Sequence, residues 1–212
     1  MSEGPASTTD PDLVRAIAGL AVPGLLIGHR VIQPGDEDAL LAEEAAMVAP
    51  SVMQRQRASG AARIVARSFL AQFGYSEAPI LKDTSGAPIW PGSIVGSLAH
   101  DERIAVAAVG QTPMISAVGI DVEPAEILPP DMLSLVVTPD EWQSLADDPL
   151  RSRVLFALKE AVYKAVFPLD RRFLEFQHIN VDLPRRQAVT RDGRVVDVRY
   201  CVSSHIVALA LI

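Results

Sequence analysis

Two long helical segments constrain the fold of this 212-residue chain more than any other feature. Val52 to Phe73 repeats apolar residues at helical spacing, and Gly74 follows it. Arg151 to Phe167 is the second such segment, and Pro168 is expected to end it because proline interrupts helical hydrogen bonding. Strand candidates follow each helix. The pattern predicts an α+β fold with one long helix and several strands in each half.

The remaining elements are predicted from alternation and turn residues. The N-terminal dozen residues are polar and rich in Ser, Thr and Pro, so we expect them to be loose. A short helix is expected over Leu40 to Val48. Strands are expected at 24–32, 94–100, 103–109, 117–123, 179–183, 194–202 and 205–211. The break at Gly110 to Pro113 places the boundary between an N-terminal half, residues 1–113, and a C-terminal half, residues 114–212.

Composition excludes several classes of protein. Apolar residues make up 49% of the chain and charged residues 21%, which is typical of a globular domain. The net charge of −7 argues against nucleic acid as a partner, because phosphate backbones require clustered Lys and Arg. A single cysteine, Cys201, excludes an internal disulfide framework. With no apolar leader after Met1 and no membrane-spanning run, the expected location is the cytoplasm, with no membrane partner.

An acidic strand is the most informative short segment. In Val118–Pro124, side chains alternate between two faces, so Val118 is expected to face a core and Asp121 and Glu123 the other side. Two carboxylates so close together repel each other unless a cation lies between them, and Mg²⁺ suits such a pair. The alternative is a solvated edge strand with its polar residues facing water.

The second helix carries a charged pair that extends this argument. Glu160 and Lys164 are four residues apart and share one helix face. They form either an ordinary surface pair or a functional one, in which Glu160 is a third metal ligand and Lys164 contacts a phosphate. A histidine, His100, ends the Gly96–His100 segment and is a candidate phosphate donor. Three basic residues precede it, Arg63, Arg67 and Lys82.

In their order along the chain these segments resemble the 4′-phosphopantetheinyl transferases of the surfactin and enterobactin synthetase type. The resemblance rests on Gly86–Pro91, Gly96–His100, Gly119–Pro124 and Lys159–Ala165, and it covers roughly residues 50–185. Trp90–Pro91 and Phe167–Leu169 are most similar to the enterobactin-associated subgroup.

The resemblance implies two similar α/β halves related by a pseudo-twofold, with the active site between them. It also implies transfer of the phosphopantetheine arm of coenzyme A to a serine of an apo acyl, aryl or peptidyl carrier protein, releasing adenosine 3′,5′-bisphosphate. The usual clients of the subgroup are siderophore and other secondary-metabolite synthetases.

The resemblance also implies roles for individual residues. Asp121, Glu123 and Glu160 would hold Mg²⁺. Lys164 and Lys159 would neutralise the diphosphate of coenzyme A. His100, Lys82 and Arg63 would contact the nucleotide phosphates. The base for the carrier serine is either Glu160 or a metal-bound water, which the sequence does not decide.

Two residues depart from the family pattern beside His100. Ala99 stands where the family usually has a hydroxyl, and Asp101 places an acid next to the expected phosphate site. These departures bear on cofactor affinity more than on the reaction type.

Two other functions remain open on the sequence. A magnesium-dependent phosphohydrolase would use the same carboxylates on a small molecule, and a non-catalytic protein would bind coenzyme A without transfer. Arg171, Arg172 and Phe173 form a candidate carrier-docking patch. Because two fused halves would complete the site within one chain, a monomer is expected.

Overall fold

The computed structural model describes residues 7–145 and 148–212. Its helices are α1 (Pro11–Ala18), α2 (Ala42–Val48), α3 (Met53–Gln72), α4 (Pro130–Val136) and α5 (Arg151–Asp170). Its strands are β1 (Leu25–Val31), β2 (Leu81–Lys82), β3 (Pro88–Ile89), β4 (Ile94–His100), β5 (Ile104–Gln111), β6 (Val118–Pro124), β7 (Ile179–Asp182), β8 (Gln187–Thr190), β9 (Val195–Val202) and β10 (His205–Leu211). Short 3-10 turns lie at Asp36–Ala39, Trp142–Leu145 and Phe176–His178.

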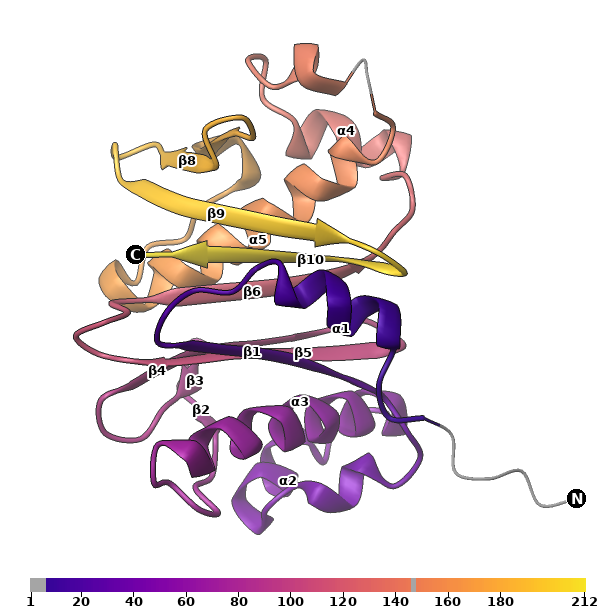
Figure 1. Cartoon of the computed structure of the whole chain (residues 1–212), viewed down its shortest axis with the longest axis vertical. Helices are drawn as coiled ribbons and strands as arrows, with labels where there is room; N and C mark the ends of the chain where they lie inside the picture. The colour runs from indigo at the N-terminus through magenta and orange to yellow at the C-terminus, as the bar shows by residue number, and fades with distance from the viewer. Residues whose placement is uncertain (1–6, 146–147) are drawn as a thin grey trace, which may run out of the picture.

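The two main sheets repeat one topology. In the N-terminal half the strand order is β1-β5-β4, and in the C-terminal half it is β6-β10-β9-β8-β7. In the N-terminal half the last strand, β5, lies between β1 and β4 and pairs antiparallel with both. In the C-terminal half the last strand, β10, lies in the same way between β6 and β9. A long helix, α3 or α5, follows the first strand and packs on the sheet (Figure 1). This repeat confirms the predicted α+β architecture of two similar halves.

A shared apolar core joins the halves. Ile104 and Val106 of β5 pack in one cluster with Ile120 and Val122 of β6 and with Leu209 of β10. Helix α1 crosses the junction and contacts both β1 and β9 (Figure 1). A side-chain bond crosses it as well, because the Ile120 backbone N–H donates to the Ser97 hydroxyl at 3.1 Å. Apolar burial of this kind is the main stabilising force between packed sheets, so the two halves are held as one unit.

Most of the predicted elements are confirmed, and three differences have clear causes. The N-terminal segment is not loose from residue 10 onward, because the Asp10 carboxylate caps α1 by accepting from the Asp12 and Leu13 N–H groups. Helix α5 does not stop at Pro168 but ends at Asp170, and Arg171, which adopts φ 60°, caps it. Pro168 lies in the last turn, where its missing N–H removes one terminal hydrogen bond rather than interrupting a helix interior. Residues 1–6 of the segment expected to be loose lie outside the described residues.

The third difference concerns β6. The alternation left two possibilities for the second face, a metal site or a solvated edge. In the structure Gly119 and Asp121 are buried as well as Ile120, because α5 covers this face. The alternative of a solvated edge strand is therefore wrong for Asp121. A strand buried on both faces places its polar residue in the interface between helix and sheet.

The close packing of α5 on β6 depends on Gly119. A Cβ atom there would lie 1.9 Å from the Ala161 carbonyl oxygen and 2.7 Å from the Ala165 nitrogen, both of which are backbone atoms of α5. We expect Gly119→Ala to lower the free energy of unfolding by about 1–3 kcal/mol, since overpacking displaces the helix. Urea denaturation measures this loss. Gly19→Ala is the matched control, because its Cβ would meet only the Ala16 carbonyl at 3.2 Å and its stability should change little.

Candidate active site

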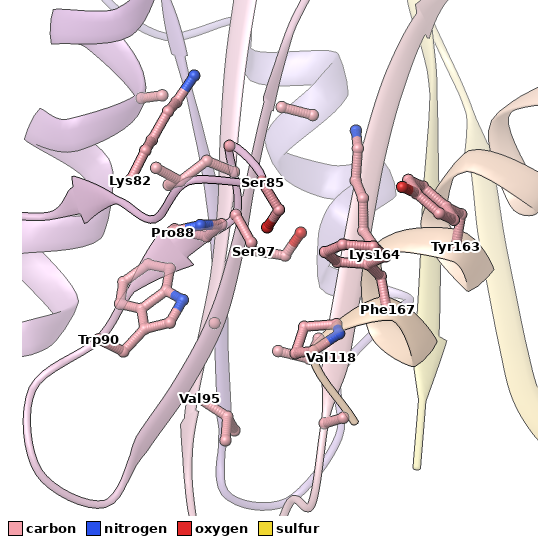
Figure 2. Close-up of a pocket in the computed structure, with 18 of the residues that line it drawn as sticks. Lys82, Ser85, Pro88, Trp90, Val95, Ser97, Val118, Tyr163, Lys164 and Phe167 are labelled. Carbon is pink, nitrogen blue, oxygen red and sulfur yellow. The ribbon is translucent and has the colours of Figure 1, made fainter. Parts of the chain in front are cut away.

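A cleft of about 540 Å³ opens between the two halves. The N-terminal half contributes the β2–β3 hairpin, β4 and α3, and the C-terminal half contributes the start of β6 and one face of α5. Figure 2 shows Lys82 and Lys164 on opposite sides, both extending toward the same end of the view, with Ser97 between them. The cleft thus presents charges from both halves to a single space.

Asp121 and Lys164 form the central ion pair of this region. The Lys164 Nζ donates to Asp121 Oδ1 at 2.6 Å and to the Ile120 carbonyl at 3.3 Å. Only 6% of Asp121 is exposed, and its other oxygen, Oδ2, is buried without a hydrogen-bond partner. Burial raises the pKa of Asp121, although the Lys164 charge acts in the opposite direction. A buried carboxylate oxygen without a partner is rare in folded proteins and marks a position where a cation would be favourable.

The other two predicted carboxylates lie within electrostatic reach of Asp121. Burial and the Asp121 charge raise the pKa of Glu123 to about 7, despite a 2.9 Å ion pair with Arg153. The same two causes raise the pKa of Glu160, which lines the cleft. All three carboxylates are therefore less acidic than usual, as expected for clustered, partly buried acids.

These residues fit a divalent cation in chemistry but are not assembled around one point. Within residues 7–145 and 148–212, no group of three or more His, Cys, Asp or Glu side chains is arranged to hold a metal ion. Lys164 and Arg153 each occupy an oxygen of the carboxylate they pair with, Asp121 and Glu123. The unpartnered Asp121 Oδ2 and the mutual repulsion of the acids are the observations that support Mg²⁺, a hard ion that prefers carboxylate oxygens.

The opposite side of the cleft carries cations without acidic partners. Among the described residues, no carboxylate pairs with the Lys82 ammonium, whose pKa is lowered by burial and by the charges of Arg63 and Arg55. Burial also lowers the pKa of His100, and the charges of Lys164, Arg55 and Lys82 add to this effect. A group of basic side chains in which Lys82 lacks an acidic partner among the described residues favours an anion such as phosphate.

Arg55 is a basic residue that the sequence argument missed. It lies on α3 eight residues before Arg63, which is about two helical turns. It shares a second hollow with His100, and its guanidinium makes no ion pair or side-chain hydrogen bond in the part of the chain that is described. The spacing to Arg63 on one helix face was the signal that could have found it.

Arg63 itself is mainly engaged in structure. Only 2% of it is exposed, and its guanidinium donates to the Ile80 carbonyl at 2.7 Å and to the Ser59 hydroxyl at 2.6 Å. Its charge is balanced by Glu44 at 3.4 Å. Arg63 borders the cleft, but its donors hold α3 to the segment before β2, so the predicted direct contact of Arg63 with a phosphate is not favoured by its hydrogen bonds.

Lys159 does not line the cleft, which corrects the expectation of a phosphate contact. Its side chain is fully buried, and Nζ donates to Glu141 Oε2 at 2.8 Å, to the Val136 carbonyl at 2.6 Å and to the Phe176 carbonyl at 3.2 Å. These three acceptors satisfy all three donors of an ammonium group. Lys159 therefore anchors α5 to the segments around α4 and before β7.

Arg171 and Phe173 of the candidate docking patch have different surroundings in the structure. Arg171 pairs with Asp83 of the β2–β3 turn and donates to the Ser85 hydroxyl at 3.2 Å, so it links the halves. Phe173 is 71% exposed and contacts the Tyr163 ring edge-on at a centroid distance of 5.7 Å. An exposed aromatic next to a residue that lines the cleft is a reasonable contact for a macromolecular partner.

Two family models match most of this chain. Residues 43–110 match the family model of the 4′-phosphopantetheinyl transferase N-terminal domain, and residues 117–210 match that of the 4′-phosphopantetheinyl transferase superfamily. The chain therefore belongs to the 4′-phosphopantetheinyl transferase superfamily, which confirms the predicted enzyme class at the level of the family. The exact boundary between the halves remains a prediction.

Curated relatives refine this placement. The chain is 40% identical over 148 residues to 4′-phosphopantetheinyl transferase PptT of Mycobacterium tuberculosis, covering 66% of this chain and 64% of that protein. It is 40% identical over 165 residues to 4′-phosphopantetheinyl transferase Npt of Nocardia iowensis, covering 76% and 74%. Enterobactin synthase component D of Escherichia coli is 26% identical over 179 residues, covering 81% and 84%. The predicted likeness to the enterobactin subgroup is thus a distant one.

One solved structure was also found to be similar. The crystal structure of the holo-[acyl-carrier-protein] synthase of Thermotoga maritima is 22% identical and covers 46% of this chain and 63% of its own. The TM-score of 0.37 is too low to compare the two folds. Separately, none of the described helices is both long enough and apolar enough to cross a membrane.

Proposed function

We propose that this chain transfers the 4′-phosphopantetheine group of coenzyme A to a serine of an apo carrier protein, with Mg²⁺, and releases adenosine 3′,5′-bisphosphate. The observation that carries the proposal is the charge pattern of the cleft. Glu160 and Lys164 of α5 line one side, and Lys164 pairs with Asp121 of β6. Lys82 lines the other side, and no carboxylate pairs with it among the described residues. A diphosphate with a bound cation requires both kinds of charge in one space.

Each charged side chain of the site would have one main role. Asp121, Glu123 and Glu160 would hold Mg²⁺, which when bound neutralises diphosphate charge. Lys164 would offset the charge that develops on the leaving phosphate. Lys82, His100 and Arg55 would bind the nucleotide phosphates, with Arg63 supporting them through its charge.

The reaction forms a phosphoester bond to the carrier serine and breaks the phosphoanhydride bond of the coenzyme A diphosphate. The carrier serine oxygen bonds to the phosphorus that bears the pantetheine arm, and the bond from that phosphorus to the bridging oxygen breaks. The serine proton must leave with a base, and Glu160 is our candidate because it lines the cleft and because burial and the Asp121 charge raise its pKa, which makes it a stronger base. No nucleophile of this chain is needed, since the partner provides the serine.

We further propose that the protein acts in the cytoplasm as a monomer and modifies carrier proteins of siderophore or other secondary-metabolite synthetases. The exposed Phe173 beside Tyr163 supports a carrier-docking surface at this mouth of the cleft. The secondary-metabolite assignment rests on the distant enterobactin synthase relative.

Intact mass spectrometry of the carrier tests the reaction. The pure chain is incubated with coenzyme A, MgCl₂ and an apo peptidyl carrier protein, and the carrier is expected to gain one phosphopantetheine. Adding EDTA should abolish the gain. Coenzyme A breakdown without a carrier would indicate a phosphohydrolase instead. Calorimetric binding of coenzyme A with no transfer to several carriers would indicate a non-catalytic binder.

Lys82 provides a test of the anion side of the cleft. We expect Lys82→Gln to raise the KM for coenzyme A about tenfold, the size of one charged hydrogen bond, with little change in kcat. Because no carboxylate pairs with Lys82 among the described residues, the variant should remain as stable as the wild type. Arg15→Gln, on the exposed face of α1, is the control and should leave KM unchanged. An unaltered KM in Lys82→Gln would remove this residue from the phosphate site.

A further inference from the structure

A chain of hydrogen bonds lies beside the cleft and outside the roles assigned above. The Ser204 hydroxyl donates to Asp10 Oδ2 at 2.6 Å and lies 3.1 Å from Nδ1 of His205. The other ring nitrogen of His205, Nε2, lies 2.9 Å from Asp101 Oδ2. We call Asp10, Ser204, His205 and Asp101 the histidine clasp. It joins the cap of α1, the β9–β10 turn and the β4–β5 turn, which are far apart in the sequence.

The hydrogen-bond donors and acceptors of the histidine clasp indicate the charge of His205. The hydrogen bonds from Ser204 and two backbone N–H groups lower the pKa of Asp10, so this carboxylate accepts and the Ser204 proton points toward it. The Ser204 oxygen can then only accept from Nδ1 of His205. Burial acts to raise the pKa of Asp101, but bonds from His205 and two backbone N–H groups outweigh it, so Asp101 also accepts. Both ring nitrogens of His205 must donate, which is the bonding pattern of an imidazolium.

The clasp also shapes the turn that follows His100. Asp101 Oδ1 accepts from the Arg103 and Ile104 N–H groups, both at 2.7 Å, which sets the bend between β4 and β5. Its second oxygen is held by His205, of which only 2% is exposed. The acid next to His100, which the sequence presents as unfavourable for a phosphate, is therefore neutralised from the other half of the molecule.

Other charged groups around His205 come from each neighbouring element. His29 of β1 accepts from the Asp10 N–H at Nε2, at 2.9 Å, which is the bonding of a neutral ring. Burial lowers the pKa of His29, and a charge on His205 adds to this effect, while Asp10 opposes it. The hollow that His205 borders is also lined by charged residues of α3, the β4–β5 turn and the segment after β6, namely Arg55, Glu102, Arg103 and Glu126.

We infer that His205 is a positioning residue, held as an imidazolium between Asp101 and Ser204, that fixes the β4–β5 turn and with it His100 at the anion end of the cleft. The effect on ligand binding rests on the proposed function, because coenzyme A is the ligand concerned. The charge state of His205 is independent of it.

The first experiment measures that charge state in the unaltered protein. Long-range ¹H–¹⁵N spectra at pH 8 are recorded on the full chain, with His205→Gln used for assignment. An ordinary imidazole, with a pKa of about 6.5, is neutral at this pH. We expect both ring nitrogens of His205 to be protonated, and His178, whose Nδ1 accepts from the Glu175 N–H at 3.2 Å, to serve as the reference for an accepting ring nitrogen. A neutral His205 would overturn the inference.

The second experiment is a double-mutant cycle on coenzyme A binding, measured by calorimetry. Asp101→Asn retains the acceptor for the turn, and His205→Gln retains one donor toward Asp101. Each single variant is expected to bind coenzyme A about fivefold more weakly than the wild type. The double variant should bind coenzyme A no more weakly than either single variant. In turnover, KM for coenzyme A should rise while kcat stays the same. His178→Gln is the matched control and should not alter binding.

The outcomes separate this inference from the proposed function. Additive losses, or an equal fall in kcat, would assign the clasp to general stability and overturn the positioning role. If the wild-type protein bound no coenzyme A at all, the proposed function would fail, and the spectra would still decide the state of His205.

Discussion

Replacing Asp121 by asparagine is expected to slow carrier modification by about a hundredfold or more, because the negative charge of a carboxylate that we propose to hold Mg²⁺ is lost. The protein should remain folded. Burial raises the pKa of Asp121, so its charged form costs stability at neutral pH, and a neutral side chain of the same shape removes that cost. We expect the free energy of unfolding to stay the same or increase. Initial rates from carrier mass and urea denaturation at pH 7 measure the two effects.

Two further experiments test whether the loss of activity is specific to Asp121. Asp182→Asn removes an acid that pairs with exposed Arg185, and it should leave the transfer rate unchanged. Raising MgCl₂ should restore part of the activity of Asp121→Asn if a weaker metal site persists. Loss of folding in Asp121→Asn would mean that the Asp121–Lys164 pair is a structural element and would contradict the metal assignment.

Lys159→Met is expected to lower the free energy of unfolding by about 3–5 kcal/mol, the cost of leaving a buried partner charge uncompensated. Glu141 would remain buried, holding only the N–H groups of Thr138 and Val181. Two backbone carbonyls would lose their donor at the same time. Chemical denaturation measures the loss, and coenzyme A KM should change little in the fraction that remains folded.

The double variant with Glu141→Gln tests the cause of that loss. Neutralising Glu141 should recover part of the stability, since no isolated charge then remains in the interior. Arg185→Met breaks an exposed pair and should leave the free energy of unfolding almost unchanged. Normal stability of Lys159→Met together with a raised KM would instead support the phosphate contact that the sequence suggested.

The sequence alone could not distinguish the roles of Lys159 and Lys164. Both lie in one motif on α5, and the family resemblance suggests phosphate for each. At 100° per residue, five positions turn the side chain by about 140°, so the two lysines point in different directions. Which direction meets the cleft depends on how α5 packs on β6, and this packing is set by Gly119 in the other motif.

The contact between His205 and Asp101 in the histidine clasp could not be predicted from the sequence either. His205 and Asp101 are separated by half of the chain, and no local pattern links them. The sequence alone presented Asp101 as an acid beside a phosphate site. Antiparallel pairing of β6 with β10 and the packing of the two sheets bring His205 to it.

The amino-acid sequence alone predicts the long helices and most of the strands, the acidic strand, the charged helix and the family that these motifs indicate. Helical and strand periodicity are local properties, and motif spacing is read directly from the chain. The tertiary structure decided which charges meet: Asp121 with Lys164, Lys159 with Glu141, and Asp101 with His205. These pairs form because buried charges must find partners, and the partners are chosen by the packing of helices and sheets rather than by distance along the chain.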